Sequence, residues 1–111
     1  MLNITERREG LVSVLDLDGD LNEENCSDLQ KYIKRLYGEK RYWIVLDLNN
    51  VGFIGSHALG ILLFADREAR EGKGRLKLLK PQPAIRMIFD GTRTKYLFEI
   101  FDKEASAINS F

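Results

Sequence analysis

The sequence has few of the features that mark a secreted or membrane protein. Its 111 residues include one cysteine, one histidine and two prolines. A lone cysteine excludes an internal disulfide and fits a reducing compartment. The first ten residues carry four charges and no apolar stretch, unlike a signal peptide, and no apolar run approaches the ~20 residues that span a bilayer. We therefore expect a cytoplasmic protein without a membrane role.

An excess of charge of one sign is also missing. Seventeen Lys and Arg balance seventeen Asp and Glu, so no overall field draws the protein to nucleic acid or to an acidic membrane. The balance is uneven, however, because residues 67–95 hold nine basic and three acidic side chains. These charges can be solvated ends of helices and strands, or a surface for an acidic partner. A nucleic-acid site is disfavoured, because no aromatic interleaving or reading motif accompanies them.

Length and hydrophobic patterning indicate one α/β domain over residues 1–111. Strands are expected over residues 11–17, 43–48, 75–79 and about 98–101, with a weaker candidate at 2–6. Helices are expected over residues 23–38, 56–71, 83–89 and 103–109. The strand–helix–strand succession over residues 43–79 favours parallel pairing through a right-handed crossover. The expected architecture is a small mixed sheet of four or five strands, covered by three or four helices.

Local signals predict how the helices begin and which faces they bury. Asn22, Ser56 and Asp102 are expected to cap the first, second and last helix, because their side-chain oxygens can accept from free backbone N–H groups. Cys26 recurs at helical spacing with leucine and isoleucine, so we expect it to be a core residue. The third helix is expected to turn three side chains inward: Ala84, Met87 and Ile88.

Residues 53–60 are the most informative segment, because they join the carboxyl end of a strand to the start of a helix, where open α/β sheets present their sites. Ser56 can be a helix cap, a nucleophile or a phosphoacceptor. A catalytic serine needs a base within reach, but His57, the only histidine, is its direct neighbour and projects elsewhere. The G-x-S-x-G motif is also absent.

A phosphate on Ser56 would lie over unpaired backbone amides at the positive end of the helix dipole. It would add roughly −1.5 to −2 charges to whatever surface a partner covers, so docking there would weaken. Such a switch requires no catalytic group in this chain.

Four stretches in order resemble the STAS domain of bacterial anti-sigma factor antagonists. They are Gly-Asp-Leu at residues 19–21, Ile-Val-Leu-Asp-Leu at 44–48, residues 53–60, and residues 85–91 followed by 98–101. In the third stretch, Ser56 matches the serine that is phosphorylated in that family. Gly55 stands where the family usually has an acidic residue, His57 where it has serine or threonine, and Ala58 where it has glycine.

The resemblance implies a protein that binds an anti-sigma factor, itself a serine kinase, and so frees a sigma factor for transcription. Phosphorylation of Ser56 would end the interaction and a PP2C-type phosphatase would restore it. ATP and magnesium belong to the kinase, so the chain is expected to be no enzyme and to need no cofactor. The alternative is a non-cycling STAS interaction module of a stress-signalling scaffold or a lipid-transport complex. In either case the expected partner-binding residues are Asp20, Asn22, Glu23, Gly55, Ser56, His57, Ile61 and Phe64.

Overall fold

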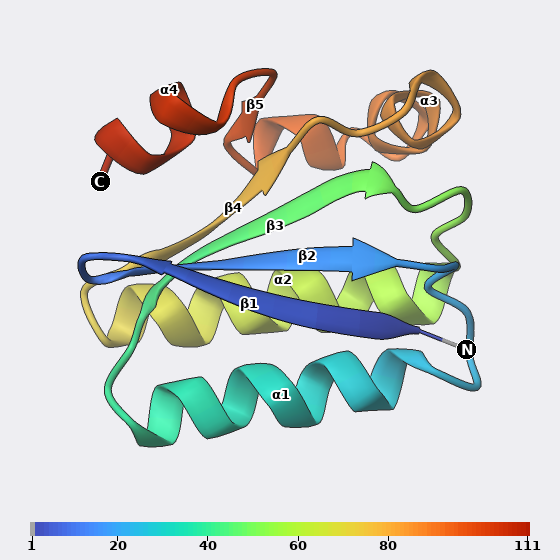
Figure 1. Cartoon of the computed structure of the whole chain (residues 1–111). Coiled ribbons are helices and arrows are strands. Elements are labelled where there is room, and N and C mark those ends of the chain that lie inside the picture. Colours follow the sequence, from blue (N-terminus) through green and yellow to red (C-terminus); the bar gives the residue numbers. More distant parts are fainter. Residues whose placement is uncertain (1) are drawn as a thin grey trace.

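A computed structural model describes residues 2–111 as a five-stranded sheet with helices on both faces (Figure 1). The elements in chain order are β1 (Asn3–Glu9), β2 (Val12–Asp18), α1 (Cys26–Gly38), β3 (Trp43–Asn50), α2 (Ser56–Glu71), β4 (Arg75–Leu79), α3 (Pro83–Gly91), the 3₁₀ helix η1 (Thr94–Tyr96), β5 (Ile100–Phe101) and α4 (Glu104–Asn109). Strand order in the sheet follows the sequence. β1 runs antiparallel to β2, and the other pairs are parallel, so the expected mixed α/β sheet is confirmed.

Two separate cores hold the helices to the sheet. The larger lies between one face of the sheet and α1, α2 and α3, and includes Cys26, Leu62 and Phe89. The smaller lies under α4 on the other face, where Ala107 packs among Val14, Val45 and their neighbours. The arrowheads of β2 and β3 point to the same end of the sheet, where the loops entering α1 and α2 lie (Figure 1).

β2 is buried on both faces rather than on one. Val12, Ser13, Val14 and Leu15 are all buried, whereas Leu11, expected inside the strand, lies in the turn before it and is 66% exposed. The second buried face exists because α4, which is far from residues 11–17 in the sequence, covers it. Ser13 is tolerated in the core because its hydroxyl accepts a 2.7 Å hydrogen bond from Arg41 Nε.

The third and last helices differ from expectation in phase and capping. α3 turns Ile85 and Phe89 into the core, not Ala84 and Met87, and Met87 is 72% exposed. α3 begins at Pro83 as expected, but the face that meets the core is the one that carries Ile85 and Phe89, four residues apart. The position before α4 is Lys103, with no side-chain cap. Asp102 instead pairs with Arg86.

An ion network ties α4 to the antiparallel edge of the sheet. Arg7 on β1 donates to Asp16 on β2 over 2.7 Å and to Glu104 of α4 over 3.0 Å. Hydrogen bonds from Arg7 hold the pKa of the Asp16 and Glu104 carboxyls below their ordinary values.

Candidate functional site

The loops entering α1 and α2 are joined by main-chain hydrogen bonds. The N–H of Leu21 donates to the Phe53 carbonyl over 2.8 Å, and the N–H of Gly55 donates to the Leu21 carbonyl over 2.9 Å. Leu21 and Ile54 therefore form an isolated parallel bridge beyond the ends of β2 and β3. Both side chains are buried beneath the loops. The bridge brings residues 20–23 beside residues 55–57. The expected partner surface draws residues from both of these segments.

Two asparagines fix the shape of the first loop. Asn22 Oδ1 accepts from the N–H groups of Glu24 and Asn25, each over 3.0 Å. Asn25 returns the bond by accepting from the Asn22 N–H over 3.0 Å, and its amide nitrogen donates to the Asp20 carbonyl over 2.6 Å. The prediction that Asn22 caps the helix directly is wrong, because residues 23–25 form a turn and Asn25 precedes α1. These hydrogen bonds of Asn22 and Asn25 leave the Asp20 and Glu23 side chains exposed.

Ser56 is the first residue of α2 rather than its cap. The cap position belongs to Gly55, whose carbonyl accepts from the Leu59 N–H over 3.0 Å. The prediction of a Ser56 cap is therefore wrong by one residue. Among residues 2–111 no partner accepts from or donates to the Ser56 hydroxyl, and the residue is exposed. Its oxygen thus lies at the positive end of a sixteen-residue helix without being tied to it.

A shallow pocket of about 320 Å³ adjoins this hydroxyl. Its walls come from Glu23, Phe53, Gly55, Ser56 and His57. Phe53 is 48% exposed, and sequence reasoning did not include it among the partner residues. No sequence signal marks it, because Ile54, its neighbour in the same loop, is buried.

The exposed face of α2 extends this surface. His57 is exposed, and Phe64, two turns beyond Ser56, is 50% exposed. Ile61 is buried at 8% exposure, so its assignment to the partner surface is corrected, because it falls on the core face with Ala58 and Leu62. Phe64 is thus the solvent-facing member of the pair.

Within residues 2–111 no hydrogen bond joins His57 to Ser56, and no three His, Cys, Asp or Glu side chains are grouped to hold a metal ion. None of the helices described is long and apolar enough to cross a membrane.

Comparison with known proteins gives consistent matches. The family model of the STAS domain matches residues 3–107. A Bordetella bronchiseptica protein, provisionally named anti-sigma factor antagonist BtrV, is 24% identical over 95 residues, covering 86% of this chain and 82% of its own length.

Solved structures share the fold. A Thermotoga maritima protein, provisionally described as an anti-sigma factor antagonist, superposes with a TM-score of 0.91 at 20% identity, covering 96% of this chain and 92% of its own. The anti-sigma factor antagonist SpoIIAA in its unphosphorylated form matches with a TM-score of 0.82 at 21% identity, over 97% of this chain and 95% of its own. The phosphorylated form of SpoIIAA, from Bacillus, matches with a TM-score of 0.76, over 97% of this chain and 98% of its own.

Proposed function

The chain belongs to the STAS domain family, and from that membership we propose that it is an anti-sigma factor antagonist, switched by phosphorylation of Ser56. The observation that carries the proposal is the exposed, untethered Ser56 hydroxyl at the start of α2, beside the loop of residues 20–23. In this role the chain binds and is modified, and it performs no catalysis itself.

The fold is suited to accept the phosphate. α2 is anchored through seven buried residues, among them Leu62 and Ala69, so a group added at its exposed first residue leaves the core intact. The free N–H groups of the first turn would face the phosphate. A matched structure, SpoIIAA, exists in unphosphorylated and phosphorylated forms, which supports the analogy.

The same phosphate would repel a partner. Asp20 and Glu23 already expose carboxylates on the adjoining loop, so roughly −1.5 to −2 further charges make the surface strongly acidic. A partner that covers Ser56 would also have to desolvate the phosphate. Unphosphorylated, the surface offers the half-exposed aromatic side chains of Phe53 and Phe64, and aromatic residues are enriched in the cores of protein interfaces.

The proposed partners are an anti-sigma factor with serine kinase activity and a PP2C-type phosphatase. The kinase supplies ATP and magnesium, so this chain contributes only the acceptor hydroxyl and the docking surface. The proposed surface comprises Asp20, Asn22, Glu23, Phe53, Gly55, Ser56, His57 and Phe64. Because the kinase consumes ATP, we place the interaction in the cytoplasm.

The decisive experiment incubates the chain with its cognate anti-sigma kinase and ATP, then locates the phosphate by mass spectrometry. We expect modification at Ser56, its loss in Ser56→Ala, and its persistence in the control Ser27→Ala, which removes an exposed hydroxyl on α1. Binding to the kinase should survive in Ser56→Ala and fall after phosphorylation of the wild type.

One departure favours the second candidate, a non-cycling STAS interaction module. Gly55 takes the place of the acidic residue that is usual in the family. A side chain would fit at this position, because a Cβ there would lie 3.5 Å from its nearest neighbour, the Phe53 ring, which is an ordinary contact distance. Steric exclusion therefore does not explain the glycine. A stable complex whose affinity ignores both Ser56→Ala and Ser56→Asp would establish this candidate instead.

A further inference from the structure

Gly60 lies in the interior of α2, at a position where glycine is unfavourable for the helix. α2 runs from Ser56 to Glu71, so Gly60 is its fifth residue and most of the helix follows it. Glycine disfavours a helix interior more than any residue except proline, because it loses the most backbone entropy on folding. Gly60 is also exposed, so an alanine there would favour the helix without having to fit into the core.

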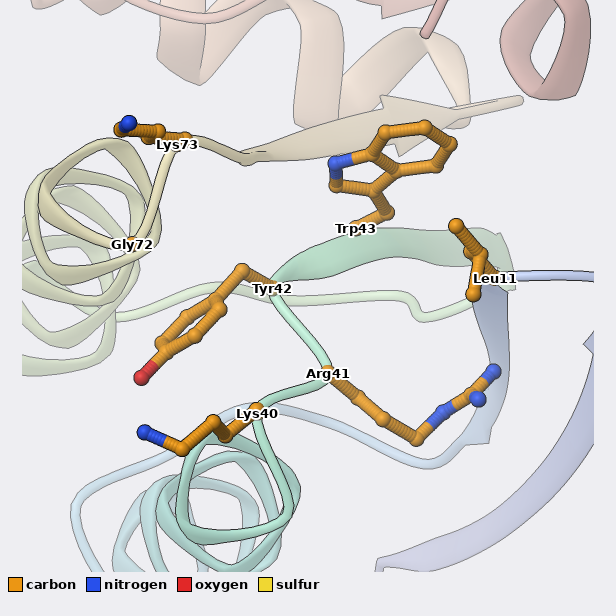
Figure 2. Close-up of a pocket in the computed structure, with 7 residues that line it drawn as sticks. All are labelled: Leu11, Lys40, Arg41, Tyr42, Trp43, Gly72 and Lys73. Carbon is orange, nitrogen blue, oxygen red and sulfur yellow. The ribbon is translucent and has the colours of Figure 1, made fainter.

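The packing of the domain does not explain this glycine. Among residues 2–111, a Cβ at Gly60 would meet no neighbouring group within 4 Å. Gly72, at the other end of α2, shows the opposite case. It lines a hollow of about 280 Å³ together with Tyr42 (Figure 2), and a Cβ on it would come within 2.5 Å of the Tyr42 ring. Positive φ, the second reason for a glycine, occurs at Gly10 and Gly19 but not at Gly60.

Gly60 lies in the middle of the docking surface proposed above. Residues three and four apart share a face of an α-helix. Gly60 therefore shares the exposed face of α2 with His57, three residues before it, and with Ser56 and Phe64, four residues before and after it. Because Gly60 has no side chain, the backbone of α2 is uncovered between the Ser56 hydroxyl and the Phe64 ring. The surface thus has a notch one helical turn from the proposed phosphoacceptor.

The same face continues to a cation. Arg67 is seven residues beyond Gly60, which is two helical turns, and it is exposed. Among residues 2–111, no carboxylate lies within ion-pair distance of Arg67. In order along this face, α2 presents a hydroxyl at Ser56, uncovered backbone at Gly60, an aromatic ring at Phe64 and a charge at Arg67. The row is about 16 Å long, the length of three turns of a partner helix.

We propose that Gly60 determines how closely a helix of the anti-sigma partner packs against α2. The proposal rests on the proposed function, because it assigns the surface around Ser56 to that partner. The axes of packed helices lie about 8–10 Å apart, depending on the side chains at the crossing, so a crossing at Gly60 permits the close end of this range. A helix seated there presents an apolar side chain to Phe64 and a carboxylate to Arg67, whose charge it complements.

A size series at this position, Gly60→Ala and Gly60→Leu, should affect folding and binding in opposite directions. Alanine and leucine favour a helix over glycine, and the Cβ has open space, so we expect Gly60→Ala to melt about 2–6 °C above the wild type and Gly60→Leu no lower than it. The Kd for the cognate anti-sigma kinase, measured by calorimetric titration, should rise about five-fold or more for alanine and further for leucine.

Gly91→Ala is the matched control. Gly91 is the exposed last residue of α3, and a Cβ there also meets nothing within 4 Å among residues 2–111, so its substitution should leave the Kd within about two-fold. The proposal is overturned if both variants of the size series bind like the wild type. It is equally overturned if they melt below the wild type, since the fold itself would then require the glycine. An Arg67→Gln variant with unchanged affinity at low salt would overturn the contact with a partner carboxylate.

A failure of this proposal can be told apart from a failure of the proposed function. Mass spectrometry of the wild type after incubation with the kinase and ATP tests Ser56 without reference to Gly60. If Ser56 is modified and the size series leaves the Kd unchanged, the switch stands and the contact at Gly60 is refuted. If Ser56 is not modified and the series weakens binding, the contact is supported and the switch is refuted. A wild type that does not bind the kinase would overturn both.

Discussion

A charge placed at Ser56 should affect folding and binding in opposite directions. Ser56 is the first residue of α2, so a carboxylate in Ser56→Asp faces the free N–H groups of the first turn. Such a charge stabilises a helix by about 0.3–1 kcal/mol at low ionic strength. Repulsion from Glu23, which shares the adjoining pocket, opposes it, but that side chain is exposed, so its contribution lies at the lower end of the range for exposed pairs, about 0.2 kcal/mol.

We therefore expect Ser56→Asp to melt about 1–4 °C above Ser56→Asn, the neutral variant of matched shape. The difference should shrink at high salt, because both contributions are screened, and should grow when Glu23→Gln is added. Binding to the anti-sigma partner should meanwhile weaken. Thermal unfolding followed by circular dichroism, with a parallel binding titration, measures both.

A lower melting temperature for Ser56→Asp than for Ser56→Asn would refute the reasoning. It would mean that the acidic loop, rather than the helix amides, dominates the potential at this hydroxyl. The fold would then resist the phosphate, and tolerance of phosphorylation would need another source.

Further expectations concern the interface, the turns and the ion network. Phe64→Ala should weaken partner binding by about ten-fold or more, while it lowers the free energy of unfolding by only about 1–2 kcal/mol because Phe64 is half-exposed. Ile61→Ala should lower the free energy of unfolding by about 3 kcal/mol, because its side chain is buried. An equal loss of binding in two well-folded variants would contradict the assignment of Phe64 to the interface. Gly74→Ala should lower the free energy of unfolding by about 2–3 kcal/mol, because its Cβ would lie 2.1 Å from the Tyr42 carbonyl oxygen. Denaturant unfolding measures this loss, and Gly60→Ala, whose Cβ would meet only open space, serves as the control. The lowered pKa values of Asp16 and Glu104 mean that their stabilisation is present above their ordinary values of 3.8 and 4.5 and is lost as pH falls through the folded pKa. Arg7→Gln should accordingly lose less stability than the wild type between about pH 5 and pH 3, and parallel pH curves for the two proteins would exclude this role for Arg7.

The sequence predicted the elements of this fold well because their signals are local. Strand β3 begins with a near-continuous apolar run interrupted by Asp47, and α1 repeats Cys26, Leu29 and Ile33 on one face, so neither needs knowledge of the rest of the chain. The same holds for the crossover from β3 to β4, whose handedness follows from chain geometry.

Errors arose where a tertiary contact decides the outcome. The residues of β2 predict a strand but not which of its faces is covered, and α4, nearly ninety residues later, buries the second face. Asp102 was expected to cap α4, but a neighbour from α3, Arg86, binds its carboxylate. Neither contact leaves a trace in the residues around the position concerned.

The candidate site shows the same division. The position of Ser56 at the start of α2 could be predicted from the strand-to-helix transition, but the cap moved to Gly55 because its carbonyl accepts the first helical bond. Ile61 and Phe64 are three residues apart, and only the direction of the core distinguishes the exposed one. Phe53 was missed because a loop has no periodicity from which exposure can be predicted.

The bridge between Leu21 and Ile54 has a consequence for how such proteins diversify. The hydrogen bonds of this bridge join main-chain groups, and the side chains of Leu21 and Ile54 are buried. The bridge that holds the two loops together therefore does not depend on the identities of Asp20, Glu23 or His57. Mutation can therefore rewrite the outer residues while the loops keep their spacing. A different set of outer side chains would then suit a different partner without any change in the backbone of either loop.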